Sequence, residues 1–112
     1  MDPESQPEAG RQVQDDSKSM YKLELTIFGR VQGVNFRNFV ETRAHEFKLV
    51  GWVKNNPDET VSIVAEGEGD VLEKFKEWCA VGPRWARVVK IEEKWIPIAK
   101  ISFDHFIVIR SV

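Results

Sequence analysis

The spacing of apolar residues changes several times along this chain, and the order of the changes restricts the fold more than any other feature. Residues 22–28 alternate polar and apolar with period two, as half-buried strands do. Residues 36–47 repeat apolar positions every three or four residues, the spacing of a helix with one buried face. Further along, the same two patterns predict strands at 50–55 and 60–66, a second helix from Asp70 to the Gly82-Pro83 pair, and strands at 89–95 and 106–109.

The resulting order, β-α-β-β-α-β plus one further strand, predicts an α+β fold of the ferredoxin-like split βαβ type. Right-handed crossovers place the two helices on one face of a mainly antiparallel sheet of four to five strands. Within the first βαβ unit the two strands are parallel, so their carboxyl ends meet at one edge of the sheet. We therefore expect the loop after the first strand to lie close to Asn55, at the end of the second.

That loop is bounded by two glycines, Gly29 and Gly33, and leads directly into the first helix. Backbone N–H groups in such a turn and in the first turn of a helix have no intrahelical partner, and together they form a natural binding site for anions. Arg37 lies in the first turn of the predicted helix and adds a positive charge. The stretch 29–37 is therefore the candidate functional site.

Composition divides the chain into a disordered acidic N-terminal tail, residues 1–20, and one folded domain, residues 21–112. The tail carries five acidic and two basic residues and almost no apolar ones, so burial cannot offset the entropy of ordering it. The rest of the chain is then close to neutral, and any preference for anions is local. We expect no nucleic-acid partner, because binding to nucleic acid by phosphate neutralisation usually needs a basic excess.

The sequence also limits location and metal binding. It has no apolar segment near its start and no run approaching the roughly 20 apolar residues of a membrane span. Cys79 is the only cysteine, which fits a reducing compartment, and its place on the apolar face of the second helix predicts a core residue. His45 and His105 have no ligand-type neighbours at metal-binding spacing. We expect a cytoplasmic monomer without membrane contact, metal or cofactor.

Two stretches carry a resemblance to a known family. Gly29-Arg30-Val31-Gln32-Gly33-Val34-Asn35-Phe36-Arg37 resembles the first signature of the acylphosphatase family, and Gly51-Trp52-Val53-Lys54-Asn55, followed by Val61 and Gly67, resembles the second. The resemblance covers residues 21–112. It implies a metal-independent acylphosphatase that hydrolyses the carboxyl–phosphate bond of acetyl phosphate, carbamoyl phosphate or 1,3-bisphosphoglycerate by direct in-line attack of water. Inorganic phosphate would be a product or inhibitor.

The resemblance also implies roles for individual residues. Arg37 would hold the phosphoryl group, and Asn55 would orient the attacking water. The amides of the loop would surround the phosphate oxygens; they belong to Gln32, Gly33, Val34, Asn35 and Phe36. Independent chemistry agrees with this assignment, since phosphoryl transfer needs donors around three charged oxygens more than it needs a nucleophile. Arginine suits two of those oxygens because its planar fork donates two parallel bonds.

Three local features carry their own expectations. Glu59 stands where the family usually has a glycine, after Asn56-Pro57-Asp58, so a positive φ there would cost of order 1 kcal/mol. Asn35 is expected to help cap the first helix rather than to act in catalysis. Asp70 and Glu73, three residues apart, predict a capping box at the start of the second helix.

Two other functions remain open at the level of sequence. A ferredoxin-like fold can serve as a non-catalytic module that binds protein or RNA on its open sheet face. An RNA-binding version should carry aromatic residues in an RNP-like order on its central strands, and the first and third strands lack them. A carbamoyl-phosphate-specific domain of a larger maturation factor is the second alternative; the missing zinc-binding cysteines and the expected completeness of the chain argue against it.

Overall fold

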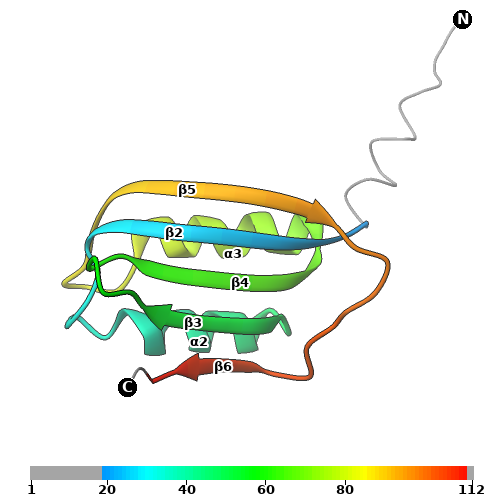
Figure 1. The fold of residues 1–112 in the computed structure, drawn as a ribbon, viewed down its shortest axis with the longest axis horizontal. Coiled ribbons are helices and arrows are strands. Elements are labelled where there is room, and N and C mark those ends of the chain that lie inside the picture. Colours follow the sequence, from blue (N-terminus) through cyan, green and yellow to red (C-terminus); the bar gives the residue numbers. More distant parts are fainter. Residues whose placement is uncertain (1–18, 111–112) are drawn as a thin grey trace, which may run out of the picture.

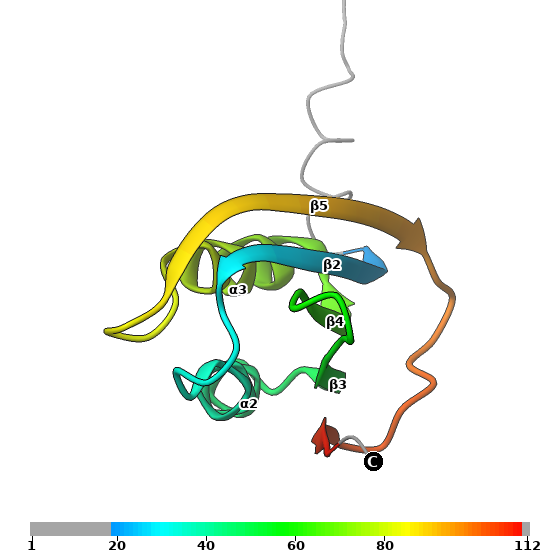
Figure 2. The ribbon, with the colours of Figure 1, turned by 60° about the vertical axis from the view of Figure 1, so that its left-hand side comes forward.

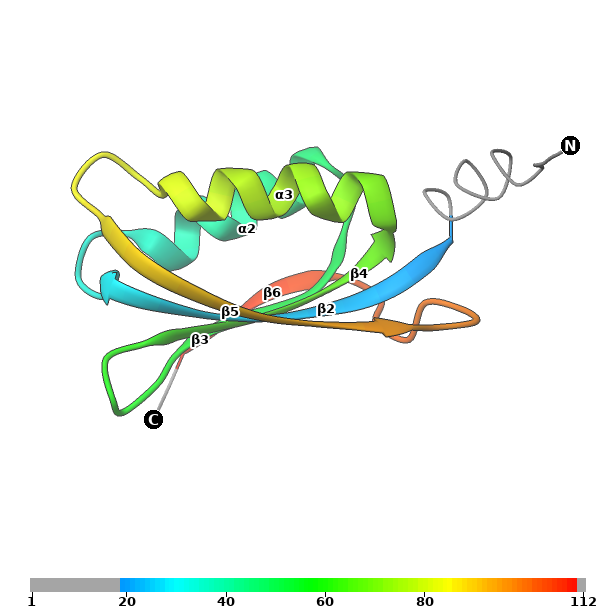
Figure 3. The ribbon, with the colours of Figure 1, turned by 90° about the horizontal axis from the view of Figure 1, so that it is seen from above.

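The alternating segments form one five-stranded sheet, and both helices pack on the same face of it (Figure 1, Figure 3). The computed structural model describes residues 19–110. Most of the predicted acidic tail therefore lies outside the described residues. The elements in chain order are β2 (Met20–Arg30), α2 (Phe36–Glu46), β3 (Val50–Asn55), β4 (Val61–Glu68), α3 (Gly69–Val81), β5 (Arg87–Pro97) and β6 (Phe106–Ile109). This arrangement confirms the predicted α+β, ferredoxin-like class.

The pairing of the strands brings the two predicted signatures together. The strand order is β5-β2-β4-β3-β6, and only β3 and β6 run parallel as neighbours. Strands β2 and β3 both pair antiparallel with β4, so they are parallel to each other. Val61 of β4 lies opposite Ile27 of β2 on one side and opposite Asn55 of β3 on the other. The loop after β2 and the end of β3 consequently meet at one end of the molecule, the left end in Figure 1.

The core lies between the sheet and the two helices. Alternate residues of β2, Leu23, Leu25 and Ile27, are fully or almost fully buried, which confirms the period-two reading of this strand. The helices contribute buried side chains at helical spacing: Phe36, Val40 and Ala44 from α2, and Leu72, Phe75 and Cys79 from α3. Burial raises the pKa of the Cys79 thiol far above its ordinary value, so this cysteine stays protonated. The prediction that Cys79 is a core residue is confirmed.

The start of α3 differs from the prediction. The helix begins at Gly69 with Glu68 at the N-cap position, and the Glu68 side chain makes no capping hydrogen bond. The predicted capping box at Asp70 is wrong, because Asp70 already lies inside the first turn, where its Oδ1 accepts from the N–H of Val71 at 2.9 Å. Tertiary pairing decides the boundary: β4 stays paired with β2 up to Glu68, and the N–H of Gly69 donates to Ser19 O at 3.0 Å.

A long connection, residues 98–105, carries the chain from β5 at one edge of the sheet to β6 at the other. It passes the ends of the intervening strands on the side away from the helices (Figure 1, Figure 2). Glu66 of β4, 1% exposed, anchors this connection by accepting from the backbone N–H and the hydroxyl of Ser102, both at 2.7 Å. Buried carboxylates are tolerated when their oxygens are hydrogen-bonded. The anchor helps hold β6 beside β3.

The hairpin between β3 and β4 contains the unusual Glu59. Its N–H donates to Asn56 O at 3.1 Å, and its φ is +75°, in the left-handed region. A turn followed by one left-handed residue is a common three-residue hairpin loop, and glycine is the residue that this last position favours. Glu59 therefore has the positive φ for which the sequence analysis expected an energetic cost. Thr60 closes the loop by donating its N–H and its hydroxyl to Asp58 Oδ1, which lowers the pKa of Asp58.

Replacing Glu59 with glycine is expected to stabilise the protein. Left-handed backbone costs a non-glycine residue about 1–2 kcal/mol, and a glycine adds about 0.5–1 kcal/mol of unfolded-state entropy, so the net gain is about 0.5–1 kcal/mol. Urea unfolding at an unchanged m-value measures it. Glu59→Asn serves as the control, since asparagine tolerates this conformation and should give an intermediate value. A loss of stability in Glu59→Gly would mean that the glutamate side chain makes a larger contribution than its backbone costs.

Candidate active site

The loop between β2 and α2 is shaped by its two glycines in different ways. Gly33 has φ +76° and faces open space, so it provides the left-handed turn of the loop. Gly29, with φ +130°, lies at the point where the register between β2 and β5 shifts, and a side chain there would collide with the carbonyl of Arg87. Gly29 thus allows the backbone of β5 to lie close to β2. Of the two glycines, Gly33 belongs to the candidate site itself.

Backbone N–H groups at the start of α2 remain available for a ligand. The helix begins at Phe36, and within residues 19–110 no protein acceptor takes up the N–H groups of residues 32–36. Asn35 occupies the N-cap position with φ +69°, but its side chain makes no hydrogen bond to the backbone. Its Oδ1 accepts from Nδ2 of Asn38 at 2.8 Å instead. The predicted cap position is therefore correct, but the capping hydrogen bond of the side chain is absent, because an N-cap residue that reaches the first-turn N–H groups normally has extended backbone.

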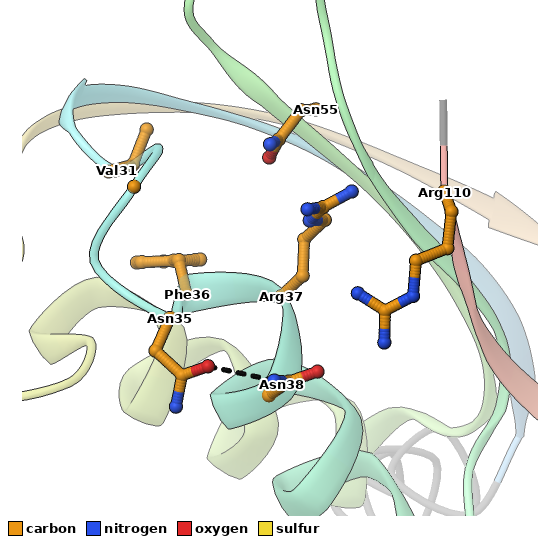
Figure 4. A pocket seen from close by; sticks show the side chains of 8 residues that line it. Val31, Asn35, Phe36, Arg37, Asn38, Asn55 and Arg110 are labelled. Atoms are coloured by element: carbon orange, nitrogen blue, oxygen red, sulfur yellow. Dashed lines mark hydrogen bonds between the residues drawn. The ribbon is translucent and has the colours of Figure 1, made fainter. Parts of the chain in front are cut away.

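These N–H groups border a pocket of about 270 Å³ in which the predicted site residues meet (Figure 4). Its lining contains Val31, Gly33, Asn35, Phe36, Arg37, Asn38, Asn55 and Arg110. Five of these residues were named from the sequence; Gln32 and Val34, also named for their amides, are not among the lining residues. Two arginines and three asparagines line the pocket, and no aspartate or glutamate among residues 19–110 does. The lining is therefore suited to a negatively charged ligand.

Arg37 projects from the first turn of α2 toward the end of β3 (Figure 4). One of its nitrogens, Nη1, donates to the carbonyl of Ile109 at 3.4 Å, which is a long hydrogen bond. No carboxylate in the described part of the chain pairs with this guanidinium. Since a guanidinium carries five N–H donors in a planar fork, most of the hydrogen-bonding capacity of Arg37 faces the pocket unused.

Asn55 is the last residue of β3, and its side chain reaches the same pocket from the opposite side (Figure 4). Its Oδ1 is buried and has no hydrogen-bond partner in the structure. A buried acceptor without a partner costs roughly 1–3 kcal/mol, and proteins retain such groups mainly where they have a use. The free Oδ1 is therefore an acceptor held ready for a hydrogen-bond donor that enters the pocket, and water is the smallest such donor.

Gln32 fastens the loop to the hairpin that follows Asn55. Its Nε2 donates to two backbone carbonyls, Asn56 O and Thr60 O, each at 2.8 Å. Within the hairpin, Nδ2 of Asn56 donates to Thr60 Oγ1 at 2.9 Å and to Ser62 Oγ at 2.7 Å. The sequence named Gln32 only for its backbone amide. Its side chain therefore has a second use, which is to fix the distance between the loop and Asn55.

Two polar lining residues, Asn38 and Arg110, were missed by the sequence reasoning. Asn38 follows Arg37 by one residue and reaches the pocket because both lie in the first turn of α2. Arg110 is far from the loop in sequence and enters the pocket because β6 pairs in parallel with β3, with Ile109 opposite Lys54. Arg110 could have been found from the sequence only by predicting that the last strand pairs in parallel with the second strand, 50–55, at the edge of the sheet.

The remaining questions from the sequence concern the histidines, a metal site and a membrane span. Nε2 of His45 lies 3.0 Å from the carbonyl of Phe106 and so links α2 to β6. Across residues 19–110 no group of three His, Cys, Asp or Glu side chains lies close enough to hold a metal ion. Within the same range no helix is long and apolar enough to cross a membrane.

Comparison with known proteins places the chain among proteins of similar size and fold. The sequence model of the family described as Acylphosphatase matches residues 23–108. An acylphosphatase from Salinibacter ruber is 43% identical over 85 residues, which cover 76% of this chain and 88% of that relative. The crystal structure of acylphosphatase from Bacillus subtilis has a TM-score of 0.75 and 34% identity, and covers 80% of this chain and 99% of that one.

The fold also occurs as part of a longer protein. The crystal structure of HypF from T. kodakarensis matches with a TM-score of 0.70 and 38% identity, over 82% of this chain and 12% of that chain. Both kinds of neighbour share the sheet and the two helices that position the pocket. The site can therefore be interpreted with the family as well as with its own geometry.

Proposed function

This chain belongs to the acylphosphatase family, and from that premise we propose that the pocket hydrolyses the carboxyl–phosphate bond of acyl phosphates with Arg37 and Asn55 in separate roles. The substrate is a small acyl phosphate of the acetyl phosphate, carbamoyl phosphate or 1,3-bisphosphoglycerate type, and the products are a carboxylate and inorganic phosphate. The proposal extends family membership to particular residues of this chain.

Arg37 and the loop between β2 and α2 bind the phosphoryl group. The unengaged N–H groups of residues 32–36 and the helix start favour a negatively charged group at this position. Arg37 donates two parallel hydrogen bonds to two of the phosphoryl oxygens. As the reaction proceeds, these donors stay in place around oxygens whose charge is redistributed, so they stabilise the transition state without reorganisation.

Asn55 positions the water that attacks phosphorus. A water molecule donates a hydrogen bond to its free Oδ1, which leaves a lone pair of the water directed at the phosphorus. A new bond forms between the water oxygen and phosphorus while the bond from phosphorus to the acyl oxygen breaks. The electron pair of that bond leaves on the carboxylate, and the proton of the water passes to a phosphate oxygen or to solvent. A carboxylate is a good leaving group, so the step needs no general acid.

One observation carries the proposal: the orphaned Oδ1 of Asn55 faces a cavity that also contains an arginine without a carboxylate partner. Buried polar atoms without a protein partner are few, and a hydrogen-bond donor that enters the pocket would satisfy this one. The neutral amide also avoids the repulsion that a carboxylate at the same place would exert on the substrate.

An assay on purified protein tests the proposal. We expect hydrolysis of benzoyl phosphate, followed by its ultraviolet absorbance, at a rate that a chelator changes by less than about twofold, because charge stabilisation by the protein replaces that of a metal ion. Strict dependence on a divalent cation would contradict this mechanism. Binding of phosphate without turnover would instead support the alternative of a non-catalytic ferredoxin-like module.

The remaining expectations about partners and location stay proposals. Acyl phosphate and inorganic phosphate are the small-molecule partners; we propose that the protein is a cytoplasmic monomer without a nucleic-acid partner. The lone buried cysteine supports a reducing compartment, and the near balance of charge gives no basic surface excess.

A further inference from the structure

The pocket contains a second guanidinium, that of Arg110, for which hydrolysis of a simple acyl phosphate has no evident need. Arg110 follows β6 directly, and the parallel pairing of Lys54 with Ile109 places it at the level of Asn55 in the neighbouring strand. Its side chain extends from there along the flank of Arg37 toward Asn38 (Figure 4). The cavity is therefore lined by two cations that come from different elements, α2 and the end of β6.

Nothing within the described residues neutralises Arg110. It makes no ion pair or hydrogen bond with any residue of the range 19–110, and the pocket lining holds no carboxylate. Two positive charges in one small cavity repel each other, and a bound anion relieves that repulsion. The loop amides and Arg37 already supply the donors for one phosphoryl group. Arg110 is thus left as a spare cation beside a site for one anion.

The direction of the reaction shows which part of the substrate meets Arg110. In an in-line displacement the attacking and leaving oxygens lie on opposite sides of phosphorus. In Figure 4, Asn55 lies on one side of the Arg37 guanidinium, whereas Asn38 and the Arg110 guanidinium lie on the other. If water is held at Asn55, the acyl group leaves toward the side of Arg110.

We propose that Arg110 is a specificity-determining residue that binds a second anionic group, a carboxylate or phosphate, on the acyl part of the substrate. The inference rests on the proposed function, because it uses the assignment of Asn55 to water. It predicts a preference for acyl phosphates that carry a further negative charge over those with a neutral acyl group. As the guanidinium is exposed to solvent, the preference is moderate and sensitive to salt.

A matched pair of substrates tests the inference. Benzoyl phosphate has a neutral acyl group. 3-Carboxybenzoyl phosphate and 4-carboxybenzoyl phosphate each carry one additional carboxylate, and the two isomers place it at different distances from the phosphoryl group. We expect wild type to favour a carboxylated substrate in kcat/KM, and Arg110→Gln to reduce that preference by up to about fivefold, the upper end of what an exposed ion pair contributes. The preference should also shrink between about 10 mM and about 1 M salt, where the Debye length falls from about 30 Å to about 3 Å.

Two further variants control the measurement. Arg110→Lys keeps the charge and should retain most of the preference. Arg84→Gln makes the same change at an exposed arginine that stacks on Trp85 and does not line the pocket, so it should leave the preference as in wild type. An equal loss of kcat/KM for both substrates in Arg110→Gln would overturn the inference. The positive charge of Arg110 would then act on the phosphoryl group that both substrates share and not on the added carboxylate.

Binding of a non-hydrolysable 4-carboxybenzoyl phosphonate separates the two proposals. If the phosphonate binds more weakly to Arg110→Gln than to wild type while no substrate is hydrolysed, the proposed function fails and only the anion-binding part of the role of Arg110 stands. If benzoyl phosphate is hydrolysed but neither the phosphonate nor the carboxylated substrates distinguish Arg110→Gln from wild type, the role of Arg110 fails and the proposed function stands.

Discussion

Replacement of Asn55 with alanine is expected to lower kcat by at least about 10²-fold, because the attacking water loses the group that orients it. Inorganic phosphate should still bind within about twofold of wild type, since Arg37 and the loop amides are untouched. Steady-state kinetics with benzoyl phosphate give kcat, and the inhibition constant of phosphate gives binding. The two readouts together separate a water-positioning role from a phosphate-binding one.

Stability provides a second check on the same variant. The Oδ1 of Asn55 has no protein partner, so its removal deletes no hydrogen bond of that oxygen and eliminates an unsatisfied buried acceptor. We expect Asn55→Ala to unfold at the same or a higher urea concentration than wild type. Asn55→Asp is the matched control: it has the same shape, but its charge should weaken phosphate binding as well as turnover. A loss of phosphate affinity in Asn55→Ala equal to that in Asn55→Asp would contradict the division of roles.

Replacement of Arg37 with alanine is expected to remove phosphate binding and activity together. Arginines that stabilise the charge of a transferring phosphoryl group contribute roughly 10³ to 10⁵ in rate, and we expect a loss in that range. Arg37→Lys restores the charge but not the planar fork, so phosphate affinity should recover more than kcat does. The comparison measures how much of the effect depends on geometry rather than on charge alone.

Arg43 provides the control on the same helix. It stacks on Trp78, with its guanidinium carbon 3.9 Å from the ring centroid, and pairs with Glu46 at 2.8 Å, outside the pocket. Arg43→Gln removes one positive charge from α2, as Arg37→Ala does, and should lower stability while phosphate inhibition stays within about twofold. If Arg43→Gln weakened phosphate binding as strongly as Arg37→Ala, the role of Arg37 would reduce to the overall charge of the helix.

The fold was predictable because its signals are local and consistent with one another. The alternation in β2 and the three- and four-residue spacing in α2 each identify an element without reference to the rest of the chain. Once the order of elements is known, the helix that returns the chain between β2 and β3 makes these two strands parallel, and this brings the loop and Asn55 to one end of the sheet. The sequence alone is thus enough to predict that Arg37 and Asn55 meet.

Features that depend on distant contacts were predicted poorly. The start of α3 follows the pairing of β4 with β2, which overrides the local capping preference of Asp70. Asn35 stands at an N-cap, yet the backbone of the loop turns its side chain toward Asn38. Arg110 enters the pocket only through the register of β6 with β3. In each case the deciding partner lies far away in sequence or depends on a dihedral angle that residue type does not reveal.

The two hydrogen bonds from Gln32 to Asn56 O and Thr60 O make the loop and the hairpin one mechanical unit. An anion that orders the loop therefore also orders the segment that carries Asn55, and by thermodynamic reciprocity an ordered hairpin strengthens the binding of the anion by the same free energy. The loop amides and Asn55 are thus held at a fixed separation before any ligand binds, and they respond to a bound anion together.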